Sequence, residues 1–173
     1  MSYIAPKPAY VPALLHPFPS FSMTFNRTTV IAGMFAGVAT ALWTLFEFAM
    51  GWHGPKIEIG AKTGFVGIVF PLIAIIWALR QTKTECGGVL SLRQALRVGL
   101  SISLILSAVG VVFYQIYYTA INPEFLSRMQ ASGTPADTVT QLVTVVVGSI
   151  CFSLVVALIG GLVMRSPSSA RGA

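Results

Sequence analysis

Apolar residues dominate four stretches of the chain, and polar or charged residues lie between them. The four stretches are residues 29–50, 62–79, 92–121 and 135–164. An α-helix needs roughly 20 predominantly apolar residues to cross a bilayer, and every stretch is near or above that length. The pattern therefore predicts an all-α integral membrane protein, built as a bundle of four transmembrane helices.

The third stretch carries signals at both of its ends. Ser91, followed three residues later by Gln94, has the form of a capping box, which satisfies free N–H groups where a helix begins. No residue between positions 98 and 121 is charged. Asn122-Pro123 then resembles an N-cap followed by the first residue of a short helix over 123–129.

The second stretch is the shortest and contains Pro71 near its middle. Because proline lacks an N–H group, it removes one helical hydrogen bond, so we expect a kink close to Gly67. Polar links over 51–61 and 80–90 flank this stretch. Before the fourth stretch, residues 134–137 give another helix-start signal, which ends in Asp137.

Residues 1–28 form a proline- and aromatic-rich arm. Prolines at positions 6, 8, 12, 17 and 19 exclude a continuous helix, and the apolar residues are too many for an ordinary disordered tail. The arm lies along the membrane surface, packs on a partner protein, or is a plain flexible tail. A cleaved leader is a competing interpretation of the first stretch, but the apolar run continues beyond Ala39-Thr40-Ala41. Residues 165–173 are predicted to be a flexible C-terminal tail.

The few charges indicate orientation rather than nucleic-acid binding. The chain of 173 residues has 11 Lys and Arg, 5 Asp and Glu, and a net charge of +6, but the basic residues are singletons at the ends of apolar runs. Four spans put both termini on one side, which holds eight of these basic residues against three opposite. The positive-inside rule therefore predicts cytoplasmic termini, with the lipid bilayer as the main partner.

Small residues form stripes along three of the predicted helices. Because lipid is as apolar as leucine, membrane helices associate through close backbone approach and polar contacts. We expect these stripes to be packing seams, with a substrate path along them as the alternative. The predicted helix-packing residues are Gly33, Gly37, Gly99, Ser103, Gly110, Ser149, Ser153 and Gly160.

Glu47 is the one acidic residue inside an apolar stretch. It shares a helix face with Gly33 and Gly37, so it should point into the bundle, where an unpaired carboxylate is costly. We predict a polar cluster of Glu47 with Lys62, Tyr114 and Tyr117. Such a cluster is a structural clamp, a side chain reaching interfacial water, or a site that handles protons or a ligand.

The sequence offers little that resembles catalysis. His16 and His53 lie outside the spans on opposite sides of the membrane, so they cannot act on one substrate. We find no phosphate-binding loop, no cluster at metal-ligand spacing and no nucleophile with a nearby base, and so expect no enzyme, metal or cofactor. Cys86 and Cys151 lie at different depths, which disfavours a disulfide.

Several residues around the third stretch resemble those of a bacterial family of four-span membrane proteins called domain of unknown function 4199. They are Gly87-Gly88, Leu92, Ala95, Gly99, Tyr117-Tyr118 and the run from Ile121 to Leu126. The resemblance covers roughly residues 30–164. It implies four helices that cross the bacterial inner membrane with both termini on the cytoplasmic side, and it brings no catalytic residue or ligand. The N-terminal arm and the short third loop depart from the family pattern.

Two functions follow from these features. The first is a non-catalytic accessory or assembly subunit of a larger membrane complex, acting through its helix seams and its arm. The alternative is a small oligomeric transporter or permeation unit that uses Glu47 and the kink at Pro71. The protein partner is a membrane complex or a second copy of the chain.

Overall fold

The computed structural model describes residues 25–54 and 56–164, which are entirely helices and their connections. The expectations for most of the arm, for His16 and for the tail after residue 164 lie outside these ranges. The elements are α1 (Arg27–Ala49), α2 (Ile57–Thr63), η1 (Gly64–Ile68), α3 (Val69–Glu85), α4 (Leu92–Ile116), η2 (Tyr117–Ile121), α5 (Phe125–Ala131) and α6 (Thr138–Met164).

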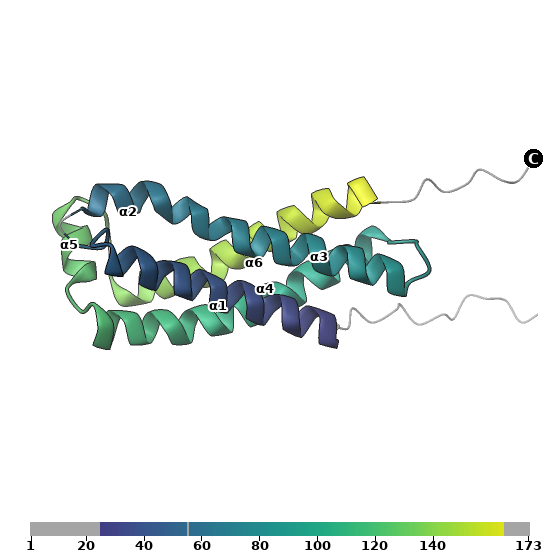
Figure 1. Cartoon of the computed structure of the whole chain (residues 1–173), viewed down its shortest axis with the longest axis horizontal. Coiled ribbons are helices and arrows are strands. Elements are labelled where there is room, and N and C mark those ends of the chain that lie inside the picture. The colour runs from purple at the N-terminus through teal and green to yellow at the C-terminus, as the bar shows by residue number, and fades with distance from the viewer. Residues whose placement is uncertain (1–24, 55, 165–173) are drawn as a thin grey trace, which may run out of the picture.

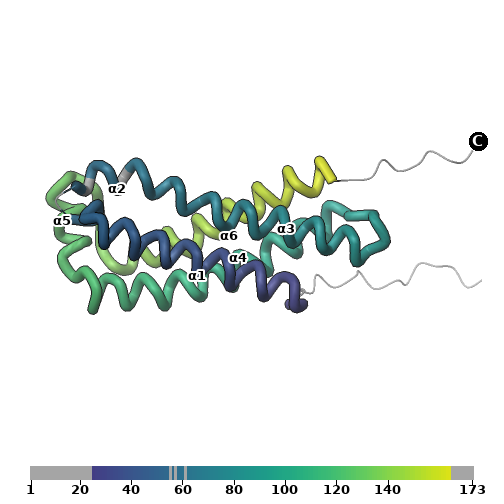
Figure 2. The backbone as a smooth tube through the Cα atoms, viewed as in Figure 1, coloured from purple at the N-terminus to yellow at the C-terminus, as the bar shows by residue number. Residues whose placement is uncertain are grey.

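Four of the helical segments are long and apolar enough to cross a membrane, which confirms the predicted fold class. They are Arg27–Ala49, Glu58–Glu85, Leu92–Ile121 and Thr138–Met164. The start of α1 and the end of α6 lie at one end of the bundle, together with the α3–α4 turn (Figures 1 and 2). We call this the terminal end. The α1–α2 link and α5 form the opposite end, called the loop end.

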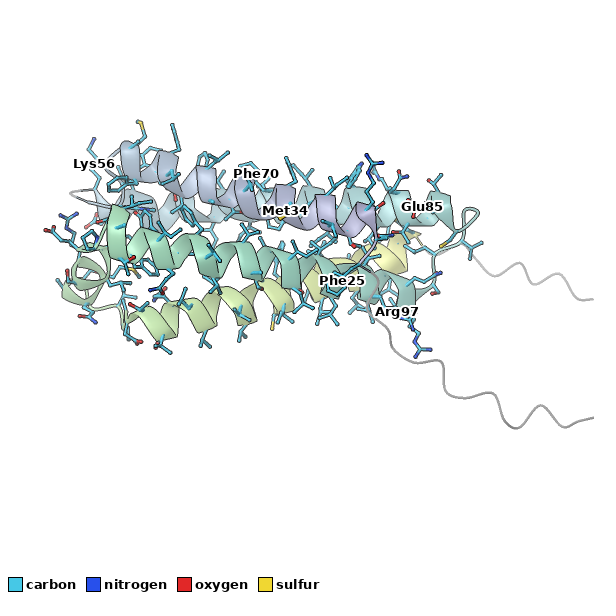
Figure 3. The ribbon with its side chains drawn as sticks, turned by 90° about the horizontal axis from the view of Figure 1, so that it is seen from below. Phe25, Met34, Lys56, Phe70, Glu85 and Arg97 are labelled. Atoms are coloured by element: carbon cyan, nitrogen blue, oxygen red, sulfur yellow. The ribbon has the colours of Figure 1, made fainter. Side chains whose placement is uncertain are left out.

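Charged side chains lie toward the two ends of the bundle, with apolar ones between them. Figure 3 shows Lys56 at the loop end, Glu85 and Arg97 at the terminal end, and Met34 and Phe70 between. The apolar window of α6 is only 11% buried inside the bundle, against 39% for the third span. The exposed apolar surface requires contact with lipid, so this is a multi-pass membrane protein.

The second span is longer than the sequence pattern predicted. It runs over Glu58–Glu85 instead of 62–79, because polar residues at both ends continue the helix beyond the apolar core. Its first half changes to the tighter 3₁₀ form over Gly64–Ile68, shortly before Pro71. Pro71 cannot donate to the carbonyl of Gly67, and the hydroxyl of Thr40 donates to that oxygen instead, at 3.5 Å. The helix therefore leaves the α form next to Gly67, where the sequence predicts a kink.

Side-chain caps fix where the helices begin. The Asn26 side chain accepts from the N–H of Thr29 at the start of α1. Ser91 and Gln94 form the predicted capping box at the start of α4. Asp137 accepts from the N–H of Thr140, so α6 begins at Thr138 and not at the predicted residue 135.

The helices form a closed ring in which α4 packs between α1 and α6, and α3 packs against both α1 and α6. A Cβ atom added at any of the five predicted glycines would lie 2.5–2.9 Å from a side chain of a neighbouring helix. Those glycines are Gly33, Gly37, Gly99, Gly110 and Gly160. Ser103 and Ser153 are fully buried. Small residues therefore allow close approach along α4, as membrane helix packing requires.

The four long helices pack closely toward the terminal end. A buried cluster there joins α1, α3, α4 and α6 through small and aliphatic side chains. A Cβ at Gly99 would lie 2.5 Å from the Cβ of Ala157, and one at Gly161 would lie 2.7 Å from the Cβ of Ala95. The free cysteines Cys86 and Cys151 are both exposed, in agreement with the expected lack of a disulfide.

Candidate functional site

Glu47 lies in the last turns of α1 and is only 3% exposed. One carboxylate oxygen, Oε1, accepts a hydrogen bond of 2.7 Å from the hydroxyl of Thr63 on α2. The other, Oε2, lies 3.3 Å from Nε2 of His53. Both oxygens therefore face donors from the loop end, which offsets part of the cost of burying the carboxylate.

The α1–α2 link brings His53 back over the end of α1. Gly51 adopts a positive φ of 76°, a conformation that side chains with a Cβ disfavour, and the N–H of Trp52 then donates to the carbonyl of Glu47. Helix α2 packs closely on this link, since a Cβ at Gly60 would lie 2.5 Å from the carbonyl oxygen of Trp52. The two glycines thus allow His53 to reach the carboxylate.

The other side of His53 contacts the end of the third span. There the helix widens into a π-helical turn, η2, which closes when the N–H of Asn122 donates to the carbonyl of Tyr117. The hydroxyl of Tyr117 lies 2.6 Å from Nδ1 of His53, and the Asn122 amide lies 3.1 Å from the same hydroxyl. The Asn122 side chain therefore joins this cluster instead of capping a helix, and α5 begins only at Phe125.

These contacts suit a neutral imidazole. The Asn122 amide nitrogen donates to the oxygen of Tyr117, which leaves the Tyr117 O–H able to donate to Nδ1 of His53. In that tautomer Nδ1 is unprotonated, and the Nε2–H faces the carboxylate of Glu47. Burial also lowers the pKa of His53 below its ordinary value of 6.5, and the nearby carboxylate opposes that shift.

Aromatic rings enclose the cluster. Tyr117 makes edge-on ring contacts with Phe48, His53 and Phe125, and Tyr118 stacks on Phe125 at a centroid distance of 6.1 Å. Such edge-on and stacked geometries are the favoured ones for aromatic pairs. The cluster is thus held between α1, η2 and α5 by a fixed aromatic frame.

The cluster lines a cavity of about 230 Å³, which shares five lining residues with a neighbouring cavity of about 330 Å³. We call the two together the chamber. Their shared lining residues are Thr40, Gly64, Gly67, Tyr114 and Val145. The second cavity reaches the middle of the bundle, and its walls are mainly glycine and apolar side chains.

The chamber has two approaches. Gly64 and Ile68 of η1, and Thr144 and Gly148 of α6, line the larger cavity and are exposed, so it opens toward lipid between η1 and α6. A third cavity of about 240 Å³ lies behind His53 and is lined by exposed residues of the loop end such as Glu58. A solute can therefore approach from water or from the bilayer.

The structure brings three of the four predicted cluster residues together. Glu47, Tyr114 and Tyr117 line the smaller cavity, where Tyr114 also hydrogen-bonds Thr44. Lys62 is exposed, and among the described residues it forms no ion pair with Glu47. Its neighbour Thr63 takes that place, because one residue along a helix turns the side chain by about 100°.

Sequence reasoning missed His53, Thr63 and Asn122. His53 was assigned to the link and excluded from chemistry, although Gly51 just before it signals a tight turn back toward Glu47. Of the predicted packing residues, Gly37, Gly110 and Ser149 also line the larger cavity. At the loop end the small-residue stripes therefore border open space as well as helix contacts.

Fold and site together define a class: a four-span helical membrane protein with a buried acid–histidine pair facing a chamber inside the bundle. A family model described as "Protein of unknown function (DUF4199)" matches residues 32–166, and the chain belongs to this family. The match confirms the resemblance drawn from the sequence. No curated protein and no solved structure matches the chain.

Proposed function

We propose that this protein is a small permeation unit, which takes a solute into the chamber and uses Glu47 to bind it. One observation carries the proposal: a carboxylate that is 3% exposed lines an open cavity within the membrane-spanning bundle. Ionisable side chains inside membranes are costly and mark substrate or ion pathways. A clamp that served stability alone would not need open space beside it.

The chamber occupies the loop end and the middle of the bundle, while the terminal end is closed by packed side chains. Passage across the membrane therefore requires a conformational change. The 3₁₀ segment η1 before Pro71 lies in the second span beside the chamber, and a 3₁₀ stretch within a helix often marks a hinge. We place the moving element there, and we expect two copies of the chain to complete the path.

The protein is proposed to be non-catalytic. Tyr117, His53 and Glu47 follow the hydroxyl–imidazole–carboxylate order of hydrolase triads. The Tyr117 side chain, however, is 0% exposed, and its oxygen already contacts Asn122 and His53. This buried hydroxyl offers no reactive group to a substrate.

A second candidate function is an accessory or assembly subunit of a larger complex. It is favoured by the sequence of residues 1–28, whose prolines and aromatic residues suit contact with a partner protein. We place the protein in the bacterial cytoplasmic membrane with both termini inside, on the strength of the bias in Lys and Arg. Purification from native membranes as a bare monomer would count against the accessory role.

Chemical access to the chamber tests the permeation unit. In a background of Cys86→Ser and Cys151→Ala, a cysteine at Thr40 lines both cavities, whereas one at Ala36, a turn earlier, lies in the packed region and is 0% exposed. We expect a small water-soluble methanethiosulfonate to label Thr40→Cys in proteoliposomes and to leave Ala36→Cys unlabelled. If Thr40→Cys resists labelling as fully as Ala36→Cys does, the proposal is overturned.

Flux provides the second measurement. Proteoliposomes containing a trapped pH dye should show a proton leak above that of empty vesicles, which Glu47→Gln removes. Glu124→Gln is the matched control, because Glu124 is an exposed acid of the loop end that pairs with Arg128 and lines none of the three cavities. A leak that survives Glu47→Gln contradicts the role given to this side chain.

A further inference from the structure

Acidic side chains line the chamber and the cavity beside it, whereas lysine and arginine do not. The three cavities are lined by two acids, Glu47 and Glu58, and by no Lys or Arg among the described residues. The groups that contact the Glu47 carboxylate are the Thr63 hydroxyl and the imidazole of His53, whose Nδ1 lies 2.6 Å from the Tyr117 hydroxyl. With a neutral imidazole, the smaller cavity holds one negative charge that hydrogen-bond donors stabilise.

Aromatic rings surround the same space. The smaller cavity is lined by Trp43, Tyr114, Tyr117, Tyr118 and Phe125 in addition to Glu47. The faces of such rings attract cations, and the attraction grows where water is excluded. A carboxylate with several rings around one cavity is the combination that recognises an ammonium group.

The larger cavity adds room for an apolar group. Its wall includes Gly37, Gly67, Gly110 and Gly148, and no atom lies within 4 Å of a Cβ added at Gly148. It also opens toward lipid between η1 and α6. An amphipathic molecule dissolved in the bilayer can thus enter with its apolar part and place its polar group near Glu47.

We propose that the chamber binds a monovalent amphipathic organic cation, with its ammonium group beside Glu47 and the aromatic lining and its apolar body in the glycine-lined cavity. This inference rests on the proposed permeation role, and it names the class of solute. The acidic side chains and the rings of the lining favour a cation over an anion. They also favour a cation over a lipid acyl chain, because an acyl chain matches only the larger cavity.

Binding of radiolabelled benzyltrimethylammonium to the purified full chain tests the inference. We expect saturable binding that unlabelled benzyltrimethylammonium displaces. Neopentylbenzene, its uncharged carbon analogue, and the benzylsulfonate anion should compete at least about tenfold more weakly, since tenfold corresponds to the strength of one buried cation–ring contact. Tetramethylammonium, which lacks the apolar body, should also compete more weakly.

Variants connect the binding to the chamber. Glu47→Gln should weaken binding at least about tenfold, because it removes the charge and keeps the shape. Glu124→Gln should leave binding unchanged. If Glu47→Gln does not fold, Gly148→Leu replaces it. Gly148 lines the larger cavity and a Cβ added there has no atom within 4 Å, so we expect a folded protein with weakened binding.

The outcomes separate this inference from the proposed function. Equal competition by neopentylbenzene, or the absence of binding while Thr40→Cys is still labelled, overturns the cation inference and leaves the permeation unit standing. Protection of Thr40→Cys overturns the permeation unit itself. Binding that Glu47→Gln or Gly148→Leu leaves unchanged also overturns the inference, since the cation then lies elsewhere.

Discussion

Two glycines, one toward each end of the bundle, have opposite surroundings. Near the terminal end, Gly99 of α4 meets Ala157 of α6 so closely that an added Cβ would lie 2.5 Å from that side chain. Near the loop end, Gly148 of the same α6 has no atom within 4 Å of such a Cβ, and it lines the chamber. A glycine in a membrane helix therefore marks close packing only where a neighbouring helix approaches it.

The polar groups differ between the two ends as well. Ser101 and Ser153 in the packed region are 0% exposed, and their hydroxyls have no hydrogen-bond partner in the described structure. Around the chamber, by contrast, Thr63, His53, Tyr117 and Asn122 form a continuous series of contacts with Glu47. The packed end depends on close contact and the chamber end on specific hydrogen bonds, which predicts different responses to substitution.

The largest effect is expected from Gly99→Leu. A leucine at this position would overlap Ala157 and the backbone of Ser153, so we expect a loss of about 3 kcal/mol or more in the free energy of unfolding. Titration with SDS in mixed micelles measures it. Gly148→Leu is the matched control in the open region, and we expect a change within about 0.5 kcal/mol. Similar losses in both variants would remove the contrast between the two ends.

Tyr117→Phe should have an intermediate effect. It leaves Nδ1 of His53 and the amide of Asn122 without their shared partner in a buried site, at a cost of about 1–2 kcal/mol. Tyr118→Phe is the control, because the Tyr118 hydroxyl makes no hydrogen bond within the described residues and its ring packs beside Tyr117. The same SDS titration compares the two, and equal losses would mean that ring packing alone holds this end.

A smaller effect is expected from pH. Because the pKa of His53 lies below 6.5 in the folded protein, the unfolded chain takes up its proton first as the pH falls. The stability that neutral His53 contributes is therefore fully present above pH 6.5, and it decreases as the pH falls from there toward the lowered pKa. Glu47 and Tyr117 are the titratable groups in contact with His53.

Melting temperatures in detergent between pH 7.5 and 5 measure this dependence. His53→Gln should flatten the curve through this window, whereas His16→Gln should leave the wild-type slope in place. A His53→Gln curve as steep as that of the wild type would assign the dependence to other groups.

The smallest effect is expected from Lys62→Gln. Since Lys62 is exposed and does not line the chamber, its removal should change the free energy of unfolding by less than about 0.5 kcal/mol. Binding of benzyltrimethylammonium should be unchanged. A marked loss in either measurement would show that Lys62 balances the charge of Glu47 after all.

The sequence by itself determined the four spans, the capping box at Ser91 and a departure from regular α-helix near Gly67. Each depends on residues within one or two helical turns, and hydropathy or a missing N–H group acts locally regardless of the rest of the fold. The inward direction of Glu47 was also predictable, because the glycines on its own helix face mark the side that meets other helices. The burial of 3% agrees with that reasoning.

Only the tertiary structure decided which groups meet Glu47 and that a chamber lies beside it. Whether Thr63 or Lys62 meets Glu47 depends on a shift of one position along α2. The position of His53 depends on the turn at Gly51 and on the close approach of α2 at Gly60. The chamber depends on the distance between η1 and α6, which are far apart in the chain. Open space is the absence of atoms from every surrounding helix at once, so no local pattern of residues can encode it.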